Sequence, residues 1–199
     1  MLISSIVENQ QALDYINQRG YISYSSLACY RDGKEPGGYG ENAAFDFGTE
    51  LHSRFLEHRV TKVLSLPEEK LLAELLSVLQ SHKLVTEIMK GSYVEAGFVH
   101  PVQGVLIKGY IDIFKPGKLV ADLKTTSAPN LKAFKESMDL LQAAIYTTVT
   151  GVKEFYYIGI GKKTKEVYPY RVTSAELKSE YKTLNQLLNE IRRSKAAIG

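Results

Sequence analysis

Apolar positions along the 199-residue chain follow a helical period in its first half and a strand-like period after it. Apolar residues that recur every three to four positions predict four helices. The first covers residues 8–18, the second is a short helix that follows the serines of YISYSSL, and the third and fourth cover 47–58 and 67–91. We place the N-cap of the third helix at Thr49 and expect the fourth to break near Ser81-His82. Residues 32–43, with four glycines and a proline, predict a loop.

Runs rich in β-branched and aromatic residues follow, separated by turn residues. They predict strands at 93–100, 103–114 and 118–125, a helix at 130–150, strands at 153–161 and 165–172, and a final helix at 174–195 opening with the capping sequence SAEL. The helix at 130–150 has the length to cross over one face of a sheet. This order predicts an α/β or α+β fold with a central mixed sheet of about five strands flanked by helices.

One predicted hairpin carries charge inside apolar strands. In GYIDIFKPGKLVADLKTT, Pro116-Gly117 forms the turn, and each flanking strand contains an aspartate, Asp112 or Asp122. Side chains two apart in a strand share a face, so Asp122 and Lys124 point the same way. Two partly buried carboxylates need a cation, and oxygen ligands favour Mg²⁺ or Mn²⁺ over Zn²⁺. The pattern equally fits exposed strand carboxylates with Lys124 as a salt-bridge partner.

Composition narrows the class of protein. With 44% hydrophobic and 24% charged residues, the chain reads as one globular domain over residues 1–199, with N-terminal helices and the glycine loop at 1–45 and a core at 46–195. The single Cys29 excludes an internal disulfide and a cluster held by several thiolates of this chain. There is no apolar run of about 20 residues and MLISSIVENQ does not resemble a signal peptide, so we expect a cytoplasmic protein.

Charge is unevenly distributed along the chain. The net charge is only +3, but residues 1–100 hold 9 basic and 13 acidic residues, whereas residues 153–199 hold 10 and 5. A basic C-terminal third suits a phosphate backbone, and it also suits an ordinary solvated helix face. Charge alone therefore leaves both interpretations open.

Several motifs together resemble one nuclease family. Asp112 in KGYIDIF, the D-x-K of ADLKTT and the Q-x-x-x-Y of LLQAAIYT are similar, in this order, to motifs of the PD-(D/E)XK nucleases, in their RecB/Cas4-like branch. FDFGTELHSRFLEH resembles the branch's helix with a metal-binding histidine. ISYSSL resembles the N-terminal motif of RecE-like, or exodeoxyribonuclease VIII-like, phage-type exonucleases. Ile111 stands where the family's proline is usual, and the cysteines of the iron–sulfur members are absent.

The resemblance implies a restriction-endonuclease-like core and a role for each matching residue. Metal ligands would be His52, Asp112, Asp122 and the carbonyl of Leu123; the catalytic set would be Asp112, Asp122, Lys124 and Glu95. Gln142 and Tyr146, four apart on one helix face, would support these residues or contact the DNA backbone. Thr125 and Thr126 would donate to phosphate, or serve only as strand residues.

The function implied by the resemblance is a Mg²⁺- or Mn²⁺-dependent DNA exonuclease without an iron–sulfur cluster. Similarity to RecE-like enzymes favours 5′ to 3′ resection of linear duplex ends in phage-type recombination or repair, with a single-strand annealing protein and a homo-oligomer as further expectations and no membrane partner. Two alternatives remain: a Cas4-like single-strand nuclease without the cluster, and a non-catalytic DNA-binding module on the same fold.

Overall fold

The computed structural model describes residues 6–7, 21–33 and 43–196. The helix predicted at 8–18 and most of the glycine loop lie outside these residues. The described elements, in chain order, are β1 (Ile6–Val7), β2 (Ile22–Ser23), α2 (Tyr24–Arg31), α3 (Ala43–Leu56), α4 (Leu66–Ser81), α5 (Lys83–Met89), β3 (Tyr93–Val102), β4 (Val105–Lys115), β5 (Leu119–Thr126), α6 (Leu131–Glu136), α7 (Leu140–Thr150), β6 (Glu154–Gly161), β7 (Val167–Arg171) and α8 (Ser174–Ala196).

The strands form one mixed sheet. Within the described residues the strand order is β1-β3-β4-β5-β6-β7. β2 lies outside this order and pairs with β4. β5 and β6 run parallel, as do β2 and β4, whereas the other pairs are antiparallel. The five long strands are those predicted from the sequence, and the predicted crossover between β5 and β6 is made by α6 and α7.

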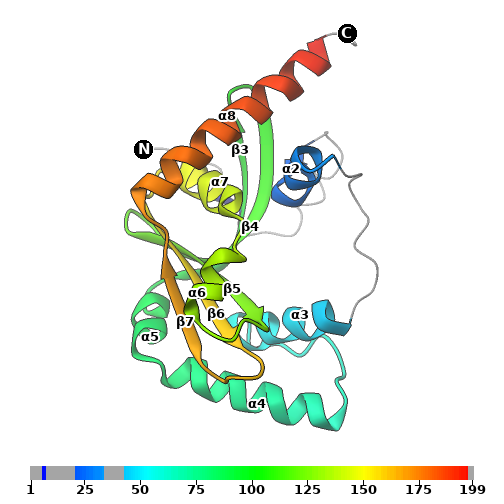
Figure 1. Ribbon diagram of the computed structural model, residues 1–199, viewed down its shortest axis with the longest axis vertical. Helices are drawn as coiled ribbons and strands as arrows, with labels where there is room; N and C mark the ends of the chain where they lie inside the picture. Colours follow the sequence, from blue (N-terminus) through cyan, green and yellow to red (C-terminus); the bar gives the residue numbers. More distant parts are fainter. Residues whose placement is uncertain (1–5, 8–20, 34–42, 197–199) are drawn as a thin grey trace.

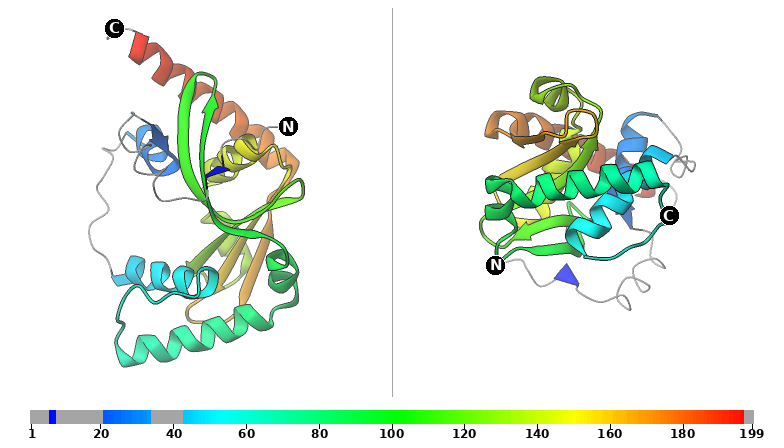
Figure 2. Two further views of the ribbon diagram at one scale, coloured as in Figure 1. Left: turned by 180° about the vertical axis from the view of Figure 1, so that it is seen from behind. Right: turned by 90° about the horizontal axis from the view of Figure 1, so that it is seen from below.

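Helices cover both faces of the sheet, and each face has its own core. In β5, Val120 belongs to one core and its neighbour Ala121 to the other, as the alternation of a strand requires. The first core includes α7 and α8, and the second is built with α3, α4 and α5. Figure 1 shows α8 running diagonally past α7 at one end of the molecule and α4 lying at the other, and the reverse view in Figure 2 shows the same arrangement.

The predicted helix at 130–150 is two helices, because two side chains cap helix starts within it. Asn130 accepts a hydrogen bond from Ala133 N at the start of α6, and Asp139 accepts one from Leu141 N at the start of α7. Between them, Ser137 ends α6.

Two other predicted helix starts are also displaced. Thr49 is not an N-cap, since α3 already begins at Ala43. At the last helix the capping residue is Thr173, one residue before SAEL, because its hydroxyl accepts from Glu176 N while the Glu176 carboxylate accepts from Thr173 N. The predicted break near Ser81-His82 is confirmed, because His82 separates α4 from α5.

The predicted hairpin forms, but its strands soon separate. Gly117 takes the left-handed backbone (φ 67°) that the turn requires. β4 and β5 pair only from Ile113 to Lys115 on the β4 side. Beyond this point the Asp112 carboxylate, and not a backbone carbonyl, accepts the Leu123 N–H (2.8 Å). The sheet therefore opens where the two aspartates lie.

Candidate metal centre

Asp112 lies at the opening between β4 and β5. The residue is only 9% exposed, and one carboxylate oxygen, Oδ2, accepts the hydrogen bond from Leu123 N. A buried carboxylate with one hydrogen bond retains further lone pairs that can bind a cation. Asp112 thus offers a carboxylate oxygen inside the sheet that could bind a metal ion.

His52 reaches this oxygen from α3. Its Nδ1 lies 3.4 Å from Asp112 Oδ2, and its Nε2 lies 2.5 Å from the carbonyl oxygen of Leu123. Burial lowers the pKa of His52, which favours the neutral ring. A neutral imidazole has one N–H and can donate to only one of these two oxygens. The other nitrogen then directs a lone pair at an oxygen, an arrangement that a cation would relieve.

The backbone of α3 approaches the sheet closely enough to place His52 there. A Cβ atom on Gly48 would lie 3.1 Å from Thr125 Oγ1, closer than ordinary van der Waals contact. Gly48 is four residues before His52, so both lie on the face of α3 that meets β5. Glycine at this position therefore sets the depth at which the imidazole enters the site.

Glu95 on β3 completes a group of three residues that could hold a metal ion. The register of β3 and β4 places it opposite Asp112, and its backbone has a positive φ of 48°, which is rare for a residue with a side chain. One ligand atom each from His52, Glu95 and Asp112 lie within 4.8 Å of one another. Strained backbone that the surrounding fold maintains is frequent at functional sites.

Asp122 and Lys124 stand beside this group on β5. Lys124 Nζ lies 2.7 Å from Asp122 Oδ2, so the two side chains share a face as their spacing predicts. Asp122 is 1% exposed, and its other oxygen accepts a hydrogen bond from Gln142 Nε2 (2.6 Å). Asp122 is therefore held by a lysine and an amide, and it is not among the three residues whose ligand atoms lie within 4.8 Å.

Negative charge exceeds positive charge at the site. Burial raises the pKa of Asp112 well above its usual range, with Asp122 adding to the effect and Lys124 opposing it, so the ionised form of Asp112 is disfavoured unless a cation binds. Burial, together with Glu57 and Asp122, raises the pKa of Glu95 to about 7. Lys124 would lose its proton more easily through burial, but Asp122 and Asp112 reverse this and raise its pKa. One lysine among three carboxylates leaves a deficit of positive charge that a divalent cation fits.

The donor types also suit a hard divalent ion. Two carboxylates and a nearby backbone carbonyl offer oxygen, and His52 offers a neutral nitrogen. In the described residues these donors come from α3, β3, β4 and β5. They converge where β4 and β5 separate.

The remaining predicted residues take supporting positions. Gln142 and Tyr146 are buried, at 6% and 5% exposure, and the Gln142 amide also donates to Tyr146 Oη (3.3 Å). The Tyr146 ring packs edge-on against Phe98. Thr125 lies against Gly48, and the Thr126 hydroxyl accepts a hydrogen bond from Ala128 N.

Sequence reasoning missed a buried network that supports α3. Glu50 is fully buried, and its carboxylate accepts hydrogen bonds from Arg54 Nε (2.5 Å), the Thr61 hydroxyl (2.6 Å) and the backbone N–H groups of Thr61 and Lys62. Arg54 also forms two 2.7 Å bonds to Glu69 on α4. The spacing of Glu50 and Arg54 along the helix was the available signal, but it is common on exposed faces.

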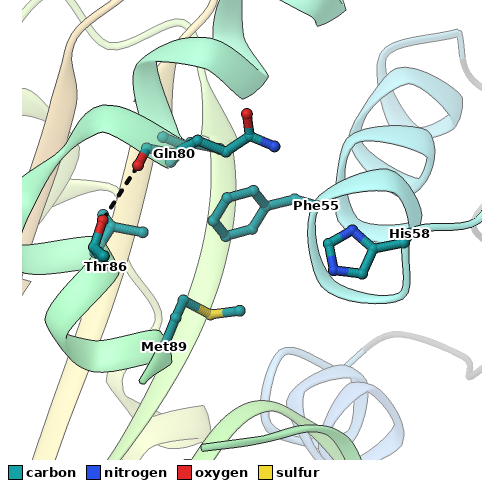
Figure 3. A pocket seen from close by; sticks show the side chains of 7 residues that line it. Phe55, His58, Gln80, Thr86 and Met89 are labelled. Carbon is teal, nitrogen blue, oxygen red and sulfur yellow. Dashed lines mark hydrogen bonds between the residues drawn. The ribbon is translucent and has the colours of Figure 1, made fainter. Parts of the chain in front are cut away.

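A separate hollow lies among α3, α4 and α5. It has a volume of about 200 Å³ and is lined by Phe55, His58, Leu79, Gln80, Val85, Thr86 and Met89. Figure 3 shows the Phe55 ring and the Met89 side chain facing it, with the Thr86 hydroxyl bonded to the Gln80 carbonyl oxygen. None of the lining residues is acidic or belongs to the metal centre. We assign it no part in the chemistry.

No helix in the described part of the chain combines the length and apolar character needed to cross a membrane.

Comparison with solved structures supports the fold. A candidate exonuclease from Eubacterium rectale is 17% identical, with 96% of this chain and 87% of that chain covered and a TM-score of 0.70. The alkaline exonuclease LHK-Exo from Laribacter hongkongensis is 13% identical, with 98% and 90% covered and a TM-score of 0.41, and its complex with dAMP gives 97%, 89% and 0.41. The first likeness confirms the predicted class, a mixed sheet flanked by helices. No curated protein matches the chain.

A family model supplies the assignment. The model described as a PDDEXK-like domain of unknown function (DUF3799) matches residues 38–159, more than half of the chain. The matched segment contains His52, Glu95, Asp112 and the D-x-K of β5, that is, every residue of the polar group described above. The protein therefore belongs to this family of PDDEXK-like domains.

Proposed function

We propose that the protein is a divalent-metal-dependent DNA exonuclease. The observation that supports this most directly is the convergence of His52, Glu95 and Asp112 beside the Asp122–Lys124 pair, at a point where the sheet opens. Buried carboxylates with one lysine are suited to phosphoryl chemistry, because the substrate brings further negative charge that must be balanced. The family assignment agrees with this use of the site.

Each residue of the site has a defined task in this proposal. His52, Glu95 and Asp112 would hold Mg²⁺ or Mn²⁺, with Asp122 and the Leu123 carbonyl adjoining. The bound ion supplies Lewis acidity toward a phosphate oxygen and makes a coordinated water more acidic. Lys124 Nζ, held by Asp122, orients the attacking water or offsets the charge that builds on the phosphate. Gln142 holds the Asp122 carboxylate in place, and Thr125 and Thr126 are positioned near the end of β5 to donate to a phosphate.

From the resemblance to RecE-like enzymes, we further propose a direction and a substrate for the exonuclease. It would resect linear double-stranded DNA ends from 5′ to 3′ in recombination or repair. Of the expected partners, DNA is the one that the chemistry of the site supports. An end-processing enzyme reads the backbone more than base edges, so we expect little sequence preference.

The test uses linear duplex DNA with different labels at its 5′ and 3′ ends, incubated with Mg²⁺, Mn²⁺ or EDTA beside a closed circle. We expect metal-dependent release of the 5′ label first, with the circle intact. Lys124→Ala and Asp122→Asn should each lower turnover at least about 100-fold, because each removes charge balance at the reacting phosphate. Lys118→Ala, which changes an exposed lysine on the turn of the same hairpin, is the matched control and should remain active.

Different outcomes separate the alternatives. Release of the 3′ label first would reject the polarity but retain the nuclease. Digestion of single-stranded DNA alone would favour the hypothesis of a Cas4-like single-strand nuclease. Wild-type protein that binds DNA yet cleaves no substrate with any ion would replace the proposal with the non-catalytic binding module.

A further inference from the structure

The α7 helix begins with a residue that the nuclease motifs do not include. Asp139 is its N-cap: the carboxylate oxygen Oδ1 accepts a hydrogen bond from Leu141 N (3.1 Å). Gln142 is the third residue of α7, so it lies in the first turn, and its backbone N–H donates to the Asp139 carbonyl oxygen (3.4 Å). The position of Gln142, and hence its 2.6 Å bond to Asp122, depends on this cap more than a mid-helix position would.

Asp139 is also tied to the strand next to Asp122. Its backbone oxygen accepts a hydrogen bond from the Tyr157 hydroxyl (2.6 Å), and Tyr157 is the register partner of Asp122 across the parallel β5–β6 pair. Register partners share a face of the sheet. A closed circuit results, from Asp122 across the sheet to Tyr157, to Asp139, along one turn of α7 to Gln142 and back to Asp122.

The carboxylate of Asp139 binds α2 at the same point. Oδ2 accepts a hydrogen bond from the Tyr24 hydroxyl (2.9 Å), and Oδ1 lies 2.8 Å from Arg31 Nη1. Tyr24 and Arg31 are the first and last residues of α2. Both ends of α2 are therefore bonded to the residue that caps α7.

We infer that Asp139 is a positioning residue for the metal centre, acting on Asp122 through the first turn of α7 and Gln142. This inference rests on the proposed nuclease function and deepens it. The expected effect on cleavage is a loss in kcat with little change in KM, because Gln142 is buried and the Asp139 carboxylate is bonded to α2 and α7.

The matched comparison is Asp139→Ala against Asn130→Ala. Asn130 caps α6 by the same kind of bond, to Ala133 N, and has no link to Asp122. Both substitutions should lower thermal stability by a few degrees. Only Asp139→Ala should lower kcat, by tenfold or more, as removal of a supporting partner of a metal site typically does. Asp139→Asn, which keeps an acceptor for Leu141 N, should recover most of the activity.

A second readout is independent of cleavage. In the wild-type protein the Gln142 side-chain amide is buried and bonded to Asp122, so its NMR signal, identified by its loss in Gln142→Leu, should exchange slowly with solvent. Exchange should quicken in Asp139→Ala and in Tyr157→Phe, which removes only the bond to the Asp139 oxygen, and stay slow in Asn130→Ala. If wild-type protein proves inactive, this measurement still decides the inference.

Unchanged exchange and kcat in Asp139→Ala would overturn the inference. So would an equal loss of kcat in Asn130→Ala, because the effect would then come from stability alone. Should Asp139→Ala fail to fold, Tyr157→Phe carries the same test, since its single lost hydroxyl leaves the ring packing unchanged.

Discussion

At the scale of a single residue, Gln142 shows how a neutral side chain can serve a charged site. Its amide donates to the Asp122 oxygen that Lys124 does not contact, while Tyr146 occupies the space beside it. A lysine at this position would cancel the charge of Asp122, whereas an amide orients the carboxylate and leaves its charge available. This explains why a buried amide, costly without partners, lies at the centre of the fold.

Replacing Gln142 tests this role. Gln142→Leu keeps the approximate volume but leaves a buried carboxylate oxygen without a donor, so we expect a stability loss of about 1–3 kcal/mol. Turnover should fall about 10- to 100-fold. Chemical denaturation and cleavage rates provide the two measurements. Wild-type turnover in a folded Gln142→Leu protein would contradict the role.

At the scale of the element, α3 is positioned by its contacts at two places. Gly48 brings the helix against Thr125, and the Glu50–Arg54 pair fastens it to the following loop and to α4. His52 lies between these contacts. The accuracy with which it meets Asp112 is therefore a property of the whole helix.

Enlarging Gly48 should move the helix. Gly48→Val adds a branched side chain where a Cβ alone would be 3.1 Å from Thr125 Oγ1. We expect α3 to shift outward and the Mn²⁺ concentration for half-maximal activity to rise about tenfold or more. The double variant Gly48→Val with Thr125→Ala should recover part of the loss, because it removes the hydroxyl. Equal metal requirements for wild type and Gly48→Val would contradict the prediction.

The Glu50 network makes a separate prediction about pH. Burial alone would raise the pKa of Glu50, but hydrogen bonds from Thr61, Arg54 and Lys62 outweigh it and lower the pKa to about 2. A carboxylate with a lowered folded-state pKa stabilises the fold above its unfolded value, near 4.5, and loses that contribution as the pH falls toward 2.

Glu50→Gln should therefore cost about 3 kcal/mol at pH 7 and progressively less below pH 4.5. Denaturation at several pH values measures this difference. Glu74→Gln is the control, because Glu74 forms an exposed ion pair with Lys165 that should contribute under about 1 kcal/mol. A pH-independent cost of Glu50→Gln would contradict the assigned charge state.

At the scale of the whole molecule, the site opposes the stability of the fold that carries it. Asp112, Asp122 and Glu95 crowd negative charge into an opened region of the sheet with Lys124 as the cation among them. The two cores on either side supply the stability that tolerates this repulsion. Functional sites commonly carry such a cost.

Metal should reverse the cost. In EDTA, Asp112→Asn should melt at a higher temperature than wild type, because it removes the cost of burying the carboxylate and its repulsion with Asp122, by about 2–4 °C for each kcal/mol relieved. With increasing Mg²⁺ or Mn²⁺ the wild-type Tm should rise, because the ion binds only the folded state, and it should overtake the variant. Thermal melting with and without metal gives the result. An identical response to metal in both proteins would exclude Asp112 as a ligand.

What the sequence determined by itself is local. Three features depend only on neighbouring residues, and the structure has all of them. They are the strand alternation around Asp112 and Asp122, the turn at Pro116-Gly117 and the D-x-K spacing. The five long strands and the crossover follow from the same periodicities. Periodicity alone predicted one helix at 130–150, whereas the caps at Asn130 and Asp139 begin two separate helices.

Which of these residues contact one another depends on long-range packing. His52 and Leu123 are 71 positions apart, and Gln142 and Asp122 are 20 apart. Their contacts depend on how closely α3 and α7 pack and on where β4 and β5 separate, which involves distances no sequence period encodes. The positive φ of Glu95 and the burial of Glu50 belong to the same class. Both cost energy locally, and the surrounding packing compensates for that cost.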